Sequence, residues 1–130
     1  MNFIYEGVSK YSLSDTLIKV KSTLKENGFG TLFELNFKDK FAEHALAFEN
    51  NFYVLEVCNP GQAKKILDIS LDIGYFLPCK VVIYEKDKKV IVGMPRPTAL
   101  LQMIVEDERA NTVAKEVETV IISSLEKAIS

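Results

Sequence analysis

The chain has 130 residues, of which 48% are hydrophobic and 26% are charged, and its formal net charge is −2. This length predicts a single domain over residues 1–130, large enough to fold around one core without a disulfide or a metal. The near balance of 16 basic and 18 acidic residues argues against the strongly basic surface of a nucleic-acid-binding protein, so we expect no nucleic-acid partner.

The N-terminal segment and the apolar runs predict neither a leader peptide nor a membrane span. Glu6 stands where a signal peptide would carry basic residues, and no apolar run approaches the roughly 20 residues that cross a bilayer. We therefore expect a cytoplasmic protein with no membrane partner. In the cytoplasm, thiols normally stay reduced.

The first half of the chain alternates between the two-residue period of strands and the three-to-four-residue period of helices. Ser12, three residues before Asp15, is suited to cap a helix, and Gly28 is suited to end it because glycine adopts the left-handed conformation freely. The predicted elements are a strand (2–11), a helix (13–27), a strand (30–37), a weakly helical connection (38–47) and a central strand (52–58).

The strongest local signal in the second half is Cys58-Asn59-Pro60. Asn59 can cap a helix and Pro60 suits its first position, so a strand ends and a helix begins here. The predicted buried face of that helix is Ala63, Ile66, Leu67 and Leu71. A hairpin (79–85 and 89–94), a short helix (98–104) and a long final helix follow. The final helix has the apolar stripe Val113, Val117, Val120, Ile121, Leu125 and Ala128.

This order of elements predicts an α+β fold. Because the second half contains a hairpin, we expect a mixed, mostly antiparallel curved sheet with helices packed on one face. The glycines at 28 and 30 follow a helix instead of a strand, which disfavours a doubly wound nucleotide-binding fold.

Three segments in order resemble the domain of unknown function 302 family. They are Gly28-Phe29-Gly30, then Val57-Cys58-Asn59-Pro60 with Ala63 following, then Leu77-Pro78-Cys79 with Val81, Val82 and Tyr84. The resemblance extends from about Tyr5 to Ile129. It implies a fold similar to the TATA-binding-protein-like β-α-β-sheet-α domains, and no established activity. Lys80 departs from the family pattern, in which many members carry Asn.

The two cysteines, Cys58 and Cys79, are candidates for a shared site because one ends a predicted strand and the other begins one. If these strands are antiparallel neighbours, the two sulfurs could face each other as a redox pair or as a two-thiolate anchor for a soft metal. Alternatively, each is a small buried apolar side chain. With only one histidine in the chain, His44, in a different element, we expect no metal site and no cofactor.

Glu56 and Arg96 are the other charged candidates. Glu56 shares a strand face with Cys58 and could act as a general base, or could simply face solvent beside Lys80 or Lys64. Arg96, between two prolines, could bind an anion, lie at a subunit contact, or pair with an acid such as Asp39 or Glu108.

No catalytic constellation emerges, so the catalytic residues stay unknown and the sequence leaves open whether the chain is an enzyme. The favoured hypothesis is a non-catalytic module that binds a ligand or acts as a homodimer. The homodimer follows from the eight Phe and five Tyr, more aromatic residues than one small core needs. The candidate ligand or redox site is Glu56, Cys58, Asn59 and Cys79. The alternative is a thiol-dependent redox or small-molecule enzyme that uses Cys58 and Cys79.

Overall fold

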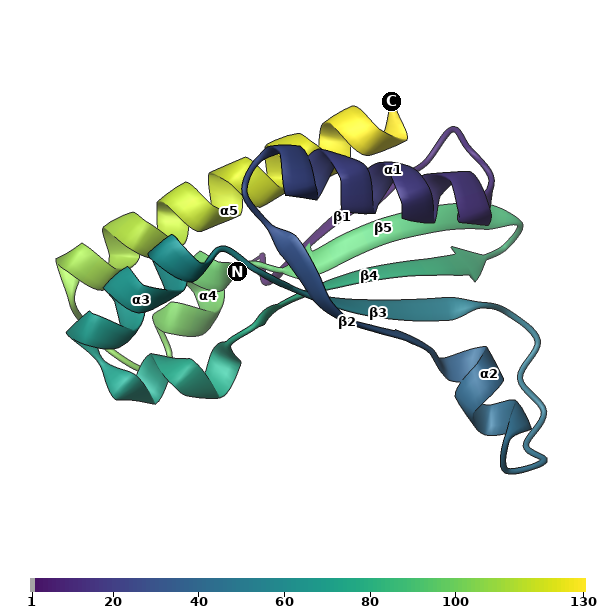
Figure 1. Ribbon diagram of the computed structural model, residues 1–130, viewed down its shortest axis with the longest axis horizontal. Coiled ribbons are helices and arrows are strands. Elements are labelled where there is room, and N and C mark those ends of the chain that lie inside the picture. The colour runs from purple at the N-terminus through teal and green to yellow at the C-terminus, as the bar shows by residue number, and fades with distance from the viewer. Residues whose placement is uncertain (1) are drawn as a thin grey trace.

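The computed structural model describes residues 2–130, and its elements follow the predicted order (Figure 1). The elements are β1 (Ile4–Val8), α1 (Leu13–Glu26), β2 (Gly30–Asn36), α2 (Phe37–Ala42), β3 (Phe52–Cys58), α3 (Pro60–Ile69), the 3-10 helix η1 (Leu71–Phe76), β4 (Cys79–Lys86), β5 (Lys89–Pro95), α4 (Pro97–Leu101) and α5 (Glu108–Ile129). This is the predicted α+β class.

The five strands form one sheet in the order β1-β5-β4-β3-β2, and every neighbouring pair is antiparallel. The sheet is therefore antiparallel throughout, within the mixed or mostly antiparallel range that we predicted. The β4–β5 hairpin turns at Asp87 and Lys88, both with positive φ, as the tight turns that match the twist of a hairpin require.

The inner face of the sheet packs against α1 and α5, which lie side by side above it in Figure 1. Leu55, Val81 and Val92 point from the three central strands into this layer and are completely buried. We call the apolar residues buried here the main cluster. They are Val20, Leu24, Phe29, Leu55, Val57, Val81, Ile83, Val92, Met94, Val117, Ile121, Leu125, Ala128 and Ile129.

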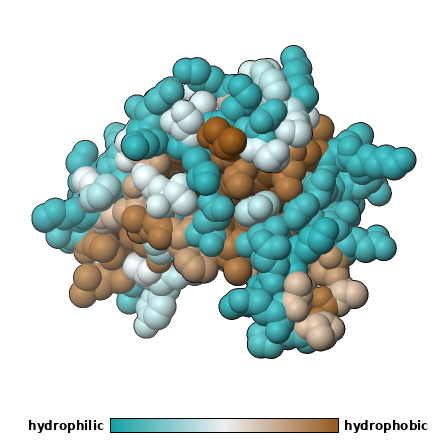
Figure 2. All heavy atoms as spheres, turned by 45° about the vertical axis from the view of Figure 1, so that its right-hand side comes forward, coloured by the Kyte–Doolittle hydropathy of each residue, from teal (hydrophilic) through white to brown (hydrophobic). Residues whose placement is uncertain are grey.

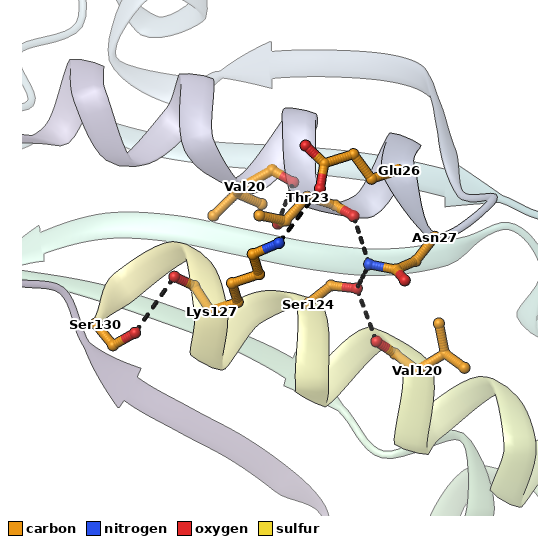
Figure 3. Close-up of polar contacts among 8 residues, drawn as sticks. All are labelled: Val20, Thr23, Glu26, Asn27, Val120, Ser124, Lys127 and Ser130. Atoms are coloured by element: carbon orange, nitrogen blue, oxygen red, sulfur yellow. Dashed lines mark hydrogen bonds and ion pairs between the residues drawn. The ribbon is translucent and has the colours of Figure 1, made fainter.

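The ends of α1 match the sequence signals. The Ser12 side chain accepts a hydrogen bond from the backbone N–H of Asp15, and Gly28 adopts φ +89°. After α1, Asn27 links the two long helices, because its Nδ2 donates both to the Thr23 carbonyl and to Ser124 Oγ of α5 (Figure 3). This contact fixes the two helices against each other over the sheet.

The lobe is the group of short elements α3, η1 and α4 beyond one end of the sheet, on the left in Figure 1. It encloses a second, smaller group of buried side chains with residues from α5. We call these the lobe cluster: Ile66, Ile73, Leu101, Ala110 and Ala114.

Several details differ from the sequence prediction. β1 covers only residues 4–8 of the predicted 2–11. A bulge between Thr31 and Phe33 breaks the alternation expected for β2, so these two residues lie on opposite faces of the sheet. α3 ends at Ile69, before the predicted core residue Leu71, which begins η1 and is 80% exposed. η1 itself was not predicted.

Within residues 2–130, no helix is both long enough and apolar enough to cross a lipid bilayer.

Candidate functional site

A cavity of about 360 Å³ lies where one end of the sheet meets the lobe and the first half of α5. Most of the side chains that line it are apolar, which suits the binding of an apolar molecule. Both clusters contribute to the walls: Val57, Met94 and Val117 from the main cluster, and Ile66, Leu101 and Ala114 from the lobe cluster. The cavity is therefore a gap in the seam between two separately packed regions.

All four predicted site residues line this cavity. Glu56 and Cys58 come from β3, Cys79 begins β4, and Asn59 lies in the turn between β3 and α3. The Asn59 side chain accepts a hydrogen bond from the backbone N–H of Gln62 at 3.1 Å and so caps α3 as predicted. The antiparallel pairing of β3 with β4 brings these residues together.

The two cysteines are free, and they do not face each other across the ladder. The register sets Val57 directly opposite Cys79, so strand alternation directs Cys58 toward the other face of the sheet. Cys79 packs against the main cluster. Burial, and to a smaller extent the nearby Cys58, raises the pKa of the Cys79 thiol to about 11. Since the thiolate is the nucleophile, this raised pKa disfavours a reactive Cys79 at neutral pH.

Gln62 is a polar residue of the site that the sequence analysis missed. It lines the cavity, and its Nε2 donates to Glu116 Oε2 at 3.3 Å. The opposite orientation of the Gln62 amide would place Oε1 against the negatively charged Glu116 carboxylate. The hydrogen bond from Nε2 therefore directs Oε1 away from Glu116. In this position Oε1 is buried and has no partner within residues 2–130. Gln62 and Ile66 lie four residues apart on one helix face, and a polar residue in that buried stripe was the available signal.

The exposed lining residues mark the mouth of the cavity. Tyr75 is 88% exposed, and its neighbour Phe76 and Lys80 are also exposed. Glu56 of β3 lies directly opposite Lys80 of β4, so one acidic and one basic side chain stand at the edge of an otherwise apolar opening.

Arg96 helps to build the lobe instead of reaching outward. Its Nη1 pairs with Glu118 Oε2 of α5 at 3.4 Å, and neither Asp39 nor Glu108, the acids that the sequence analysis suggested, is its partner. Glu118 Oε1 also accepts hydrogen bonds from the backbone N–H of Thr98 and from Thr98 Oγ1. One carboxylate from α5 thus caps the start of α4, which forms a wall of the cavity.

The described residues contain no group of three or more His, Cys, Asp or Glu side chains arranged to hold a metal ion. His44 is exposed after α2 and does not line the cavity.

Comparison with known proteins gives a family without a function. The model of the domain of unknown function DUF302 matches residues 5–128. Among solved structures, the crystal structure of an uncharacterized conserved DUF302 protein from Bacillus stearothermophilus is similar. It is 33% identical, has a TM-score of 0.93, and the match covers 98% of this chain and 99% of that one. No curated protein matches. The match over nearly the whole chain, together with the shared fold, establishes that this chain belongs to the DUF302 family.

Proposed function

We propose that this chain is a single-domain, non-catalytic module that binds a small, neutral, mainly apolar molecule in the cavity between the sheet and the lobe. The observation that carries the proposal is the cavity of about 360 Å³ with a mostly apolar lining that includes Gln62, whose buried Oε1 has no partner within residues 2–130. A buried acceptor without a partner costs free energy, which a ligand with one N–H or O–H donor would recover by displacing the atoms that cover Oε1. Free thiols agree with a cytoplasmic location.

A flat probe pair tests the proposal directly. Indole carries an N–H donor, whereas 1-methylindole has nearly the same shape and no donor. Because the chain contains no Trp, indole fluorescence can be followed without protein background when it is excited at wavelengths that tyrosine does not absorb. We expect indole to bind up to about tenfold more tightly than 1-methylindole, the effect of one hydrogen bond to a buried acceptor. If neither indole nor 1-methylindole bound detectably, the proposal would be contradicted.

Two variants localise the probe. Gln62→Met keeps the length of the side chain but removes the acceptor, so indole should lose its advantage while 1-methylindole binds as before. Ala63→Leu adds volume to a residue of the cavity wall and should weaken both probes. Dispersed NMR spectra of both variants establish that they remain folded. Binding unchanged by either substitution would place the probe elsewhere.

The thiol-based alternative has less support. A redox pair needs two approaching sulfurs and a reactive thiolate, whereas the register directs Cys58 and Cys79 to opposite faces and the pKa of Cys79 is about 11.

A second candidate function is self-association as a homodimer, which the outer face of the sheet favours. We use this name for the face turned away from α1 and α5. Neither α1 nor α5 covers this face, and three of its apolar side chains are exposed: Ile4, Val8 and Phe33. Sedimentation equilibrium tests this candidate, and a monomer at high micromolar concentration would contradict it.

A further inference from the structure

One acidic and one basic side chain stand together at the mouth of the cavity, Glu56 of β3 and Lys80 of β4. The register places them directly opposite each other. Their strand neighbours Leu55 and Val81 are buried in the main cluster, so strand alternation turns Glu56 and Lys80 to the outer face. In an antiparallel pair, such opposite residues have Cβ atoms about 4.5–5.5 Å apart. The mouth therefore carries two opposite charges that a single small molecule can reach.

Both of these charges are available to a ligand. Within residues 2–130, neither Glu56 nor Lys80 is part of an ion pair. Lys64, the other cation that the sequence placed near Glu56, pairs with Asp68 at 2.6 Å instead. Because ion pairs between exposed side chains stabilise proteins only weakly, Glu56 and Lys80 lose little when each turns to a charged group of a bound molecule.

Behind this charged pair the cavity is mainly apolar. Val57, Ile66 and Leu101 line its interior, and the exposed rings of Tyr75 and Phe76 border its mouth. Figure 2 shows apolar side chains exposed on the projection at its lower left, which corresponds to the lobe in Figure 1. The cavity volume of about 360 Å³ lies at the lower end of the range of small-molecule sites, about 300–1,000 Å³. The site thus suits a small molecule with an apolar body and a charged end.

The charged pair distinguishes between kinds of head group. A carboxylate alone is attracted by Lys80 and repelled by Glu56, and an amine alone is attracted by Glu56 and repelled by Lys80. Because the two residues stand opposite each other, attraction and repulsion largely offset each other in both cases. A head group with both charges on one carbon can set its ammonium against Glu56 and its carboxylate against Lys80. The mouth therefore favours a zwitterion over an anion or a cation.

We propose that the ligand of this cavity is a free α-amino acid with a large apolar side chain. The side chain occupies the cavity, the α-ammonium group binds Glu56 and the α-carboxylate binds Lys80. Such a molecule is a zwitterion without net charge, in agreement with a neutral, mainly apolar ligand. The inference rests on the ligand-binding function proposed above, and it adds the chemical class of the ligand and the two residues that recognise its head group.

Four indole compounds test the head group. L-Tryptophan carries both charges, tryptamine lacks the carboxylate, indole-3-propionate lacks the ammonium group, and indole lacks both. In fluorescence titrations at neutral pH, L-tryptophan should bind about fivefold more tightly than tryptamine or indole-3-propionate, which have the same ring and linker but a single charge. Indole reports the binding of the ring alone.

Two charge variants and a matched control locate the head group. Glu56→Gln leaves Lys80 alone at the mouth, so indole-3-propionate should bind at least as tightly as L-tryptophan. Lys80→Gln leaves Glu56 alone, and tryptamine should then bind at least as tightly as L-tryptophan. Lys86→Gln removes a lysine at the other end of β4, which does not line the cavity, so the order of the probes should stay that of the wild type.

The outcomes separate this inference from the ligand-binding function on which it rests. If indole binds but L-tryptophan binds no more tightly than the two singly charged probes, the amino-acid assignment is overturned and the ligand-binding function stands. An advantage of L-tryptophan that survives both Glu56→Gln and Lys80→Gln would overturn the role of these two residues. If none of the four compounds binds, the inference and the ligand-binding function are both contradicted.

Discussion

The two apolar clusters of this chain are built from elements of very different length, and they are packed to different degrees. The main cluster lies between a five-stranded sheet and two helices of 14 and 22 residues. The lobe cluster is formed by helices of 10, 6 and 5 residues against the first half of α5, and the cavity lies on its border.

Element length accounts for this difference. Long helices present continuous apolar stripes that interdigitate with the side chains of a sheet and leave few gaps. Helices of one to three turns present only a few apolar side chains each, so three such pieces do not fill the corner that they enclose. The unfilled volume forfeits dispersion contacts, and a bound molecule would restore them.

The largest effect that separates the two regions is expected from the same substitution made in each. Leu55 is completely buried in the main cluster, whereas Leu100 is half-buried at the cavity wall. Leu55→Ala should lower the free energy of unfolding by about 3 kcal/mol, because it removes packed atoms and creates a new hole. Leu100→Ala should cost only about 1 kcal/mol, since part of its surroundings is already empty. Urea unfolding measures both values, and equal costs would contradict the difference in packing.

A smaller effect is expected from Cys79, which lies at the boundary between the regions. Its pKa is raised from 9.0 to about 11 in the folded protein, mainly by burial. Between these values the unfolded chain releases a proton that the folded chain retains, so stability falls as the pH rises from about 9 to 11. The fall should reach about 2 kcal/mol.

The variant Cys79→Ala isolates this contribution to the alkaline instability. It lacks the thiol but retains every other group that titrates in the same range. Stability measured against pH should therefore fall less steeply in the variant than in the wild type. Parallel curves would mean that the Cys79 thiol ionises as easily in the folded protein as in the unfolded chain.

The sequence predicted the long elements well because their signals are repeated many times. The stripe of α5, from Val113 to Ala128, recurs over about four turns, and Val117, Ile121 and Leu125 are buried as expected. The caps at Ser12 and Asn59 were predicted because a single side chain makes the hydrogen bond within a few residues of its own position.

The lobe was predicted poorly because its signals are short or come from distant residues. Leu71 continues the apolar spacing of α3, but the chain leaves the helix at Ser70 and turns Leu71 outward. α4 has no capping side chain of its own and is capped by Glu118, twenty residues away from Thr98. The candidate site residues of β3 and β4 were identified because they lie at or near the ends of predicted strands. Sequence spacing alone did not fix whether the cysteines would face each other, because that depends on register.

The smallest expected effect compares the N-caps of the two regions, Ser12 of α1 and Asn59 of α3. Each side chain accepts one backbone hydrogen bond, at 3.2 Å and 3.1 Å, so Ser12→Ala and Asn59→Ala should each cost about 1 kcal/mol of stability. Their effects on indole binding should differ, because Asn59 lines the cavity and Ser12 does not. Loss of the cap loosens the first turn of α3, where Gln62 and Ala63 form the cavity wall, so Asn59→Ala should weaken indole binding several-fold. Thermal unfolding and fluorescence titration of both variants separate stability from binding. If both caps affected binding equally, the cavity would respond to global stability and not to the local structure of the lobe.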